Sequence, residues 1–278
     1  MKALYQLAGI SKQGHYKSVS RERKQHYQEV ELVNLAKQVR LDHKRMGMRT
    51  LYDKLQPKCI GRDRFVEVLR RNGMQIQRVR SFKRTTFAHP SSRYPNLLSG
   101  KELDDTNQAW VSDITYVRVK ERFYYLTMIL DVYSRRIVGW SLSKTLEAES
   151  NMKALRMALR CRKGANLEGL IHHSDRGSQY VFKPYLKLLK SKGVEVSMGE
   201  KAWENAHAER INGIIKLDYI QPFHPKSWEQ LKKVTKKAIK LYNCERPHSS
   251  IRKSTPLAFE KQIENIPIDK RDKYLINY

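Results

Sequence analysis

A helical spacing of apolar residues dominates the first 75 residues. We expect a short helix over residues 3–11, a turn around Gly14 and a long helix from Lys24. Two shorter helices follow, one ending before Pro57 and the other beginning after Gly61. Two short helices joined by a glycine-containing turn have the outline of a helix-turn-helix, although any small helical bundle gives the same outline.

The periodicity changes to strand-like alternation from Trp110 onward. Residues 110–117, 123–130 and 137–142 are rich in β-branched and aromatic residues and are separated by short turns, which predicts an antiparallel meander. A helix, a strand ending at Asp175, a second helix, a strand over 194–198 and two more helices complete the pattern. This order predicts an α/β (α+β) fold: an RNase H-like, mixed five-stranded sheet flanked by helices.

These patterns divide the chain into four parts. We expect residues 1–75 to form a helical region whose helix-turn-helix outline would suit DNA binding, and residues 76–105 to form a basic linker that contains Pro90 and Pro95. We expect residues 106–265 to form the RNase H-like core with its C-terminal helix, and residues 266–278 to form a tail.

Charge points to a polyanionic partner. The 278 residues carry 55 Lys and Arg against 28 Asp and Glu, a net charge of +27. Such an excess opposes compaction by self-repulsion and is typical of nucleic-acid-binding proteins, although a basic ribosomal protein would show it too. Residues 1–100 hold 22 of the basic residues and 7 of the acidic ones, so this part is the denser in positive charge.

Cysteine usage and hydropathy exclude other classes. Cys59, Cys161 and Cys244 lie far apart and form no CxxC pair, which argues against a disulfide framework or a four-cysteine zinc site. No apolar run approaches the roughly 18 residues that span a bilayer. We therefore expect a cytoplasmic, DNA-associated protein with no membrane partner.

Three carboxylates are candidates for metal-dependent chemistry. Asp113 lies in a strand, Asp175 follows a strand end, and Glu209 lies on a helix. Each has an ordinary alternative: an ion pair with an arginine for Asp113, a turn aspartate for Asp175 and a solvated helix residue for Glu209. Glu200 and Glu204 are rival third ligands, although capping of a helix start accounts for Glu204. At least one of the two histidines that precede Asp175, His172 and His173, is expected in the core.

The Glu209 helix has a polar and an apolar face. Asn205, Glu209, Asn212 and Lys216 recur at helical spacing on the polar face, next to an apolar face of Ala208, Ile211 and Ile215. The candidate DNA contacts lie partly on this helix and partly in the helical region: Arg62, Arg64, Asn205, Arg210, Asn212 and Lys216.

The surrounding residues resemble a known family. Trp110–Tyr116, His173–Tyr180 and Asn205–Glu209 look like the three sequence blocks of DDE insertion-sequence transposases with a retroviral-integrase-like core. The segment Tyr242-Asn243-Cys244-Glu245-Arg246-Pro247-His248 resembles the C-terminal signature of that family, closest to its second-reading-frame (OrfB) products. The 33 residues between Asp175 and Glu209 are a shorter spacing than is typical of the family.

This resemblance implies a function. Asp113, Asp175 and Glu209 would be the catalytic, metal-binding triad, with two Mg²⁺ ions per site and Mn²⁺ able to substitute. Water would cleave the DNA at the ends of the element, and the freed 3′-hydroxyl would attack target DNA. The implied partners are double-stranded DNA (terminal inverted repeats and target), further copies of the chain on DNA and, as an option, the upstream-frame product.

Three rival interpretations stay open at this point. A DNA-binding regulator with a catalytically silent integrase-like fold would share the charge and the fold but would not cleave DNA. A retroviral or retrotransposon integrase usually carries a His2Cys2 zinc module ahead of the core, and here Cys59 is the only cysteine before Cys161. A simple ribonuclease H would not need the basic helical region.

Overall fold

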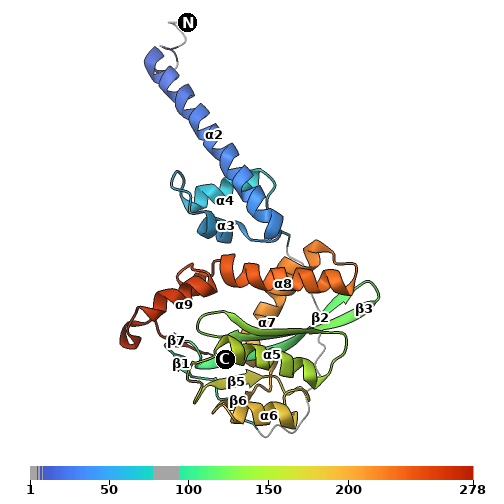
Figure 1. Cartoon of the computed structure of the whole chain (residues 1–278). Coiled ribbons are helices and arrows are strands. Elements are labelled where there is room, and N and C mark those ends of the chain that lie inside the picture. Colours follow the sequence, from blue (N-terminus) through green and yellow to red (C-terminus); the bar gives the residue numbers. More distant parts are fainter. Residues whose placement is uncertain (1–4, 6, 8, 78–93, 278) are drawn as a thin grey trace. The chain divides into compact units, whose positions relative to one another are not determined.

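The computed structural model describes residues 5, 7, 9–77 and 94–277, and the chain divides into two units, Met1–Arg78 and Val79–Tyr278. The expected helix over residues 3–11 falls partly outside the described residues. The described part of the first unit includes the helices α2 (Lys12–Asp42), α3 (Met48–Leu55) and α4 (Arg62–Arg71) (Figure 1). Its end near residue 78 is close to the boundary expected at residue 75.

Helix α2 begins twelve residues before the start expected at Lys24, and there is no turn around Gly14. The Ser11 side chain caps the helix by accepting from the Gly14 backbone N–H at 2.9 Å. Gly14 thus lies in the first turn, where a glycine does not interrupt the helix. The buried residues of the unit come from the second half of α2 and from α3, α4 and their connections: Leu32, Val33, Ala36, Met46, Leu51, Phe65, Val68, Leu69 and Met74.

The second unit is built on a mixed five-stranded sheet in the order β4-β3-β2-β5-β6, which confirms the expected fold class. Strands β2 (Ala109–Val119), β3 (Arg122–Asp131) and β4 (Ile137–Ser143) form the antiparallel meander. The short strands β5 (Ile171–Ser174) and β6 (Glu195–Met198) run parallel to β2.

Helices cover both faces of the sheet. Helices α5 (Ala148–Cys161) and α6 (Lys183–Lys190) pack on the face that includes Trp110. The opposite face, which includes Val111, is covered by α7 (Ala206–Gly213), α8 (Trp228–Glu245) and α9 (Pro256–Glu264). Neighbouring residues of a strand point to opposite faces, so Trp110 and Val111 belong to separate cores. Helix α5 packs closely against β4. A Cβ atom added at Gly139 would lie only 2.2 Å from the Ala154 carbonyl oxygen.

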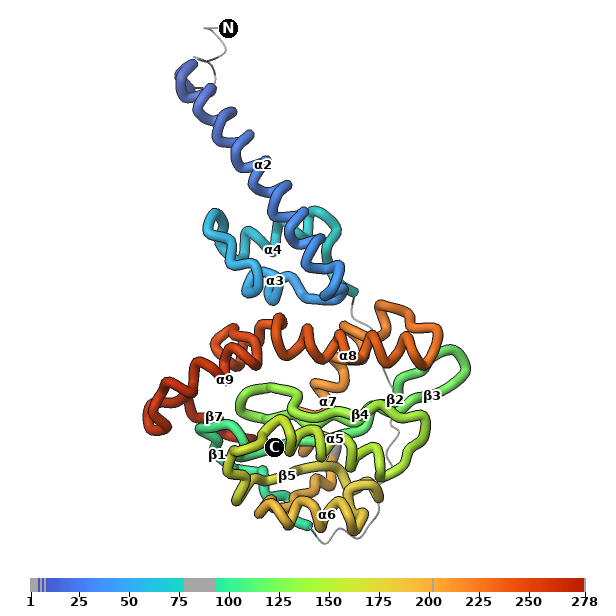
Figure 2. The backbone as a smooth tube through the Cα atoms, viewed as in Figure 1, coloured from blue at the N-terminus to red at the C-terminus, as the bar shows by residue number. Residues whose placement is uncertain are grey.

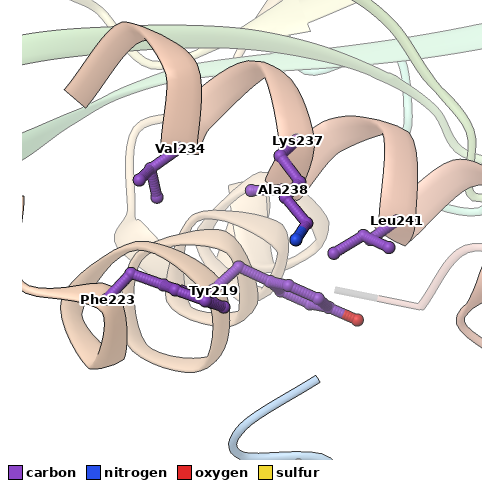
Figure 3. Close-up of a pocket in the computed structure, with 6 residues that line it drawn as sticks. All are labelled: Tyr219, Phe223, Val234, Lys237, Ala238 and Leu241. Atoms are coloured by element: carbon purple, nitrogen blue, oxygen red, sulfur yellow. The ribbon is translucent and has the colours of Figure 1, made fainter. Parts of the chain in front are cut away.

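Helix α7 continues directly into a π-helix, η2 (Ile214–Ile220). The remaining short elements are 3₁₀ turns: η1 (Ala202–Asn205), η3 (Gln221–Phe223), η4 (Ser249–Ile251) and η5 (Ile268–Lys270). Between η2 and α8 is a small recess of about 200 Å³, shown in Figure 3 and lined by Tyr219, Phe223, Val234, Lys237, Ala238 and Leu241. It contains no carboxylate, so it offers no ligand set for a divalent metal.

The second half of the expected linker and the expected tail both belong to the folded core. Strand β1 (Glu102–Leu103) pairs with β7 (Tyr274–Leu275), so segments at opposite ends of the unit are hydrogen-bonded to each other (Figure 2). Leu98, Leu103 and Ile276 are buried in the same core. Each segment alone has only a weak tendency to form a strand. Burial of these apolar side chains supplies the stabilisation that holds the two segments in place.

A buried ion-pair network holds α9 on the core. Asp131 at the end of β3 is fully buried and pairs with Arg162, which follows α5, at 3.5 Å. Arg162 and Arg136 both pair with Glu260 of α9. Two buried acids and two arginines therefore neutralise each other where three elements meet, as buried charges require.

Candidate active site

The pairing of β2 with β5 brings two of the predicted acids together. The two strands are parallel, and their register aligns Ser112 with Ser174. Asp113 follows Ser112 and Asp175 follows Ser174, so the two aspartates occupy neighbouring positions where β5 ends. Ser112 is held in place by a buried hydrogen bond to the Tyr180 hydroxyl at 2.9 Å.

Asp113 has two protein donors. Its Oδ1 accepts from the Ile114 backbone N–H at 2.7 Å, and its Oδ2 accepts from Asn212 Nδ2 at 2.8 Å. The expected alternative, an ion pair between Asp113 and an arginine, does not occur among the described residues. The side chain is therefore oriented without being neutralised.

Asp175 lies in the turn after β5. Its Oδ1 accepts from the Gly177 backbone N–H at 3.1 Å. A Cβ atom at Gly177 would lie 3.0 Å from that same oxygen. A glycine at position 177 therefore keeps the turn tight around the carboxylate, as expected for an Asp-x-Gly sequence.

Glu209 lies on α7, whose apolar side is confirmed: Ala208, Ile211 and Ile215 are buried. The helix is attached to β2 on either side of Glu209 along the chain. Asn205 Nδ2 donates to the Ser112 carbonyl at 3.0 Å, and Asn212 donates to Asp113. Both asparagines, expected among the DNA contacts, are buried and bonded inside the core, whereas Glu209 is exposed.

The charges of Asp175 and Glu209 both influence Asp113. Burial, the negative charge of Asp175 and, to a smaller extent, that of Glu209 raise the pKa of Asp113 to about 7. Burial also raises the pKa values of Asp175 and Glu209. As placed, no three Asp, Glu, His or Cys side chains of the described residues form a group that could hold a metal ion. The acids are thus close enough to interact electrostatically but are not gathered as ligands.

The rival ligands have other roles. Glu204 caps the turn η1 by accepting from the Lys201 backbone N–H at 3.3 Å, as expected, and the same oxygen accepts from the Glu200 N–H at 2.6 Å. Glu200 is exposed and pairs with Arg176 at 3.4 Å. The two histidines before Asp175 are both buried in the core. His172 shares a hydrogen bond with Tyr185, and His173 shares one with Ser197.

The candidate DNA contacts on α4 and α7 differ in how they are paired. Arg62 pairs with Asp63, and Arg64 bonds both Glu29 and Glu67, contacts that raise the pKa of Arg64. Arg210 is exposed and makes no ion pair among the described residues. Lys216 is half-buried, and this burial lowers its pKa. It lies in the π-helix η2, so the spacing of 3.6 residues per turn that was expected from Glu209 does not continue to Lys216.

Comparison with known proteins supports this architecture. Two models of the integrase core domain match the chain, over residues 104–202 and 192–256. The 31 kDa protein of insertion element IS600 from Shigella sonnei is 32% identical over 268 residues, which cover 92% of this chain and 97% of that protein. Transposase InsF of insertion sequence IS3A from Escherichia coli K12 is 34% identical over 199 residues, 70% of this chain and 68% of InsF.

The chain belongs to the insertion-sequence transposases with an integrase core. This transposase acts in transposition by DNA cleavage and strand transfer, and a purely regulatory role is not favoured. A simian T-cell lymphotropic virus intasome structure matches with a TM-score of 0.53 at 16% identity, covering 85% of this chain and 78% of that one, which shows the shared fold. In the part of the transposase that the structure describes, no helix is long and apolar enough to cross a membrane.

Proposed function

We propose that Asp113, Asp175 and Glu209 are the catalytic acids of the transposase and hold divalent metal at the scissile phosphate of the element's end. The observation that carries this proposal is the strand register. The alignment of Ser112 with Ser174 puts the two aspartates side by side, and the two asparagines that bond β2 flank Glu209 on α7.

The donor set suits a hard cation. Three carboxylates supply oxygen ligands of the kind that Mg²⁺ and Mn²⁺ prefer. Burial and then the negative charge of Asp175 raise the pKa of Asp113, and a bound cation would favour its ionised form. Glu209 makes no hydrogen bond or ion pair in the described part of the chain, so its side chain can rotate toward the aspartates.

Each neighbouring residue has a positioning task. The Ile114 N–H and the Asn212 amide fix both oxygens of Asp113, and the Gly177 N–H fixes one oxygen of Asp175. Two bound ions would activate the attacking oxygen and stabilise the leaving one. The same acids would serve cleavage by water and the later attack by the 3′-hydroxyl, since both are in-line displacements at phosphorus.

We also propose that the transposase assembles as a homo-oligomer on terminal-repeat and target DNA, which agrees with its net charge of +27. The helical unit carrying Arg62 and Arg64 is the proposed second DNA-binding region. Participation of an upstream-frame product stays a prediction.

A cleavage and strand-transfer assay on DNA carrying the element's end tests the catalytic proposal. Asp113→Asn, Asp175→Asn and Glu209→Gln should each abolish both reactions while DNA is still retained on a gel. Glu200→Gln, which removes a nearby exposed acid, should react like the unmodified protein. Normal strand transfer by any triad variant would remove that residue from the site.

A further inference from the structure

Arg135 is a buried cation without an acidic partner. It lies in the turn between β3 and β4, is 8% exposed, and has a left-handed backbone with φ of 61°. Its Nη1 donates to His207 Nδ1 at 2.7 Å, and its guanidinium stacks 4.6 Å from the centre of the Tyr274 ring. No carboxylate pairs with it among the described residues, and its buried Nε has no hydrogen-bond partner there.

The next residue shows the usual arrangement. The side chains of Arg136 and Arg162 are largely buried, and both are neutralised by Glu260. A buried charge left without an opposite charge is costly. A non-glycine residue in the left-handed region also carries strain, which is common at functional positions. The buried charge of Arg135 is therefore not compensated by an acid of the described residues, and an external anion would supply the opposite charge.

His207 directs the Arg135 guanidinium. Its Nδ1 accepts from Arg135, so its Nε2 carries the proton and donates to the Tyr274 hydroxyl at 3.1 Å. Tyr274 belongs to β7, the strand that pairs with β1 at the other end of the unit. The chain's last strand thus completes the surroundings of Arg135.

Two further arginines lie on α7 and just after α8. Arg210 lies one turn after His207 on α7 and is exposed. Arg246, just after α8, pairs with Asp218 at 3.4 Å, but its Nη1 is buried without a hydrogen-bond partner among the described residues. Burial and, after it, the positive charges of Arg246, Arg135 and Arg210 lower the pKa of His248 to about 3, which agrees with positive charge from all three arginines at this histidine.

We propose that Arg135, Arg210 and Arg246 form a binding pocket for a backbone phosphate of DNA. Guanidinium groups bind phosphate through paired, charge-assisted hydrogen bonds. The pocket begins one residue after Glu209 and uses the Arg246–His248 part of the C-terminal signature, for which the catalytic proposal has no role. This inference rests on DNA as the substrate and not on the metal-binding triad.

Salt-dependent DNA binding tests the pocket. Binding of a random-sequence duplex is measured in EDTA over a range of salt concentrations, so neither cleavage nor metal contributes. Arg210→Ala and Arg135→Asn should each weaken binding and reduce the slope of log K against log salt by about one unit. Asparagine is chosen at position 135 because it tolerates the left-handed backbone.

Arg156→Ala is the control, because Arg156 is exposed on α5, on the other face of the sheet. It removes the same charge and should leave the slope unchanged. Circular dichroism verifies folding, and the exposed Arg210 keeps the test valid if Arg135→Asn does not fold. A folded Arg210→Ala protein with the unmodified slope would overturn the pocket. The assay contains no metal and measures no cleavage, so failure of the pocket is distinguishable from failure of the catalytic proposal.

Discussion

The side-chain amide of Asn212 donates a hydrogen bond to Asp113 Oδ2 over 2.8 Å, which joins helix α7 to strand β2 at a proposed catalytic acid. This contact fixes the orientation of Asp113 relative to Glu209, three residues before Asn212 on the same helix. The Asn212 Oδ1 is buried without a hydrogen-bond partner among the described residues, whereas the Nδ2 end of the same amide holds Asp113.

Replacement of Asn212 should therefore reduce catalysis more than binding. Residues that orient metal ligands typically contribute about 10- to 100-fold to activity or metal affinity. We expect Asn212→Ala to slow cleavage by about that factor and to shift the Mg²⁺ dependence of the rate to higher concentration. Asn265→Ala, an exposed asparagine after α9, is the control. A slower rate with an unchanged Mg²⁺ dependence would assign Asn212 a purely structural role.

Asp113 should destabilise the metal-free protein at neutral and alkaline pH. Its pKa is raised from 3.8 to about 7, so its contribution to stability is present below pH 4 and is lost as pH rises through 7. Asparagine does not ionise, so Asp113→Asn avoids the loss of stability that accompanies ionisation of the buried carboxyl. The substitution should increase the free energy of unfolding by about 1–2 kcal/mol at pH 8 in EDTA. Comparison with the unmodified protein cancels the opposite contributions of buried histidines, whose pKa values are lowered.

Thermal unfolding at several Mg²⁺ concentrations completes this test. A ligand that binds only the folded state raises the unfolding temperature. The unmodified protein should be stabilised by Mg²⁺, and Asp113→Asn should lose most of that stabilisation. Equal stabilisation of the two proteins by Mg²⁺ would show that the cation binds elsewhere.

Two glycines should respond oppositely to alanine. A methyl group at Gly139 would meet the Ala154 carbonyl oxygen at 2.2 Å and force α5 away from β4, while at Gly213 on α7 it would meet nothing within 4 Å. Gly139→Ala should lower the free energy of unfolding by about 1–3 kcal/mol. Gly213→Ala should raise it by about 0.5–1 kcal/mol through helix propensity. Urea unfolding measures both, and a neutral Gly139→Ala would contradict the close packing of α5.

Much of the core could be predicted from local pattern. The strand segments, the Asp175 turn and the apolar side of α7 were predictable because alternation, turn residues and helical spacing are local signals. The contacts that organise the site are not local. The bonds from Asn205 and Asn212 to β2 span more than 90 residues of sequence, and a polar helical position gives no sign that it faces a strand.

The differences between expectation and structure have similar causes. Strands β1 and β7 have two residues each and exist only because they pair with each other, so the sequence predicted a linker and a tail. The π-helix changes the register after Gly213, which helical spacing cannot indicate. Arg135 has no distinctive sequence signal, because its significance comes from burial without an acidic partner.

Lys216 remains a predicted DNA contact in this altered register. It is half-buried and makes no ion pair in the described part of the chain. Lys216→Ala should weaken DNA binding and reduce the salt slope by about one unit. Lys163→Ala, which follows α5 on the opposite face, controls for loss of charge. An unchanged salt slope for Lys216→Ala would mean that Lys216 contacts no phosphate.

The central claim is that Asp113, Asp175 and Glu209 share a cation. The most direct measurement is anomalous diffraction from crystals of the transposase soaked with Mn²⁺. The account predicts a peak bound by carboxylate oxygens of all three residues, with Glu209 rotated toward the aspartates. An ordered Mn²⁺ ion bound elsewhere, with the three carboxylates still apart, would contradict it.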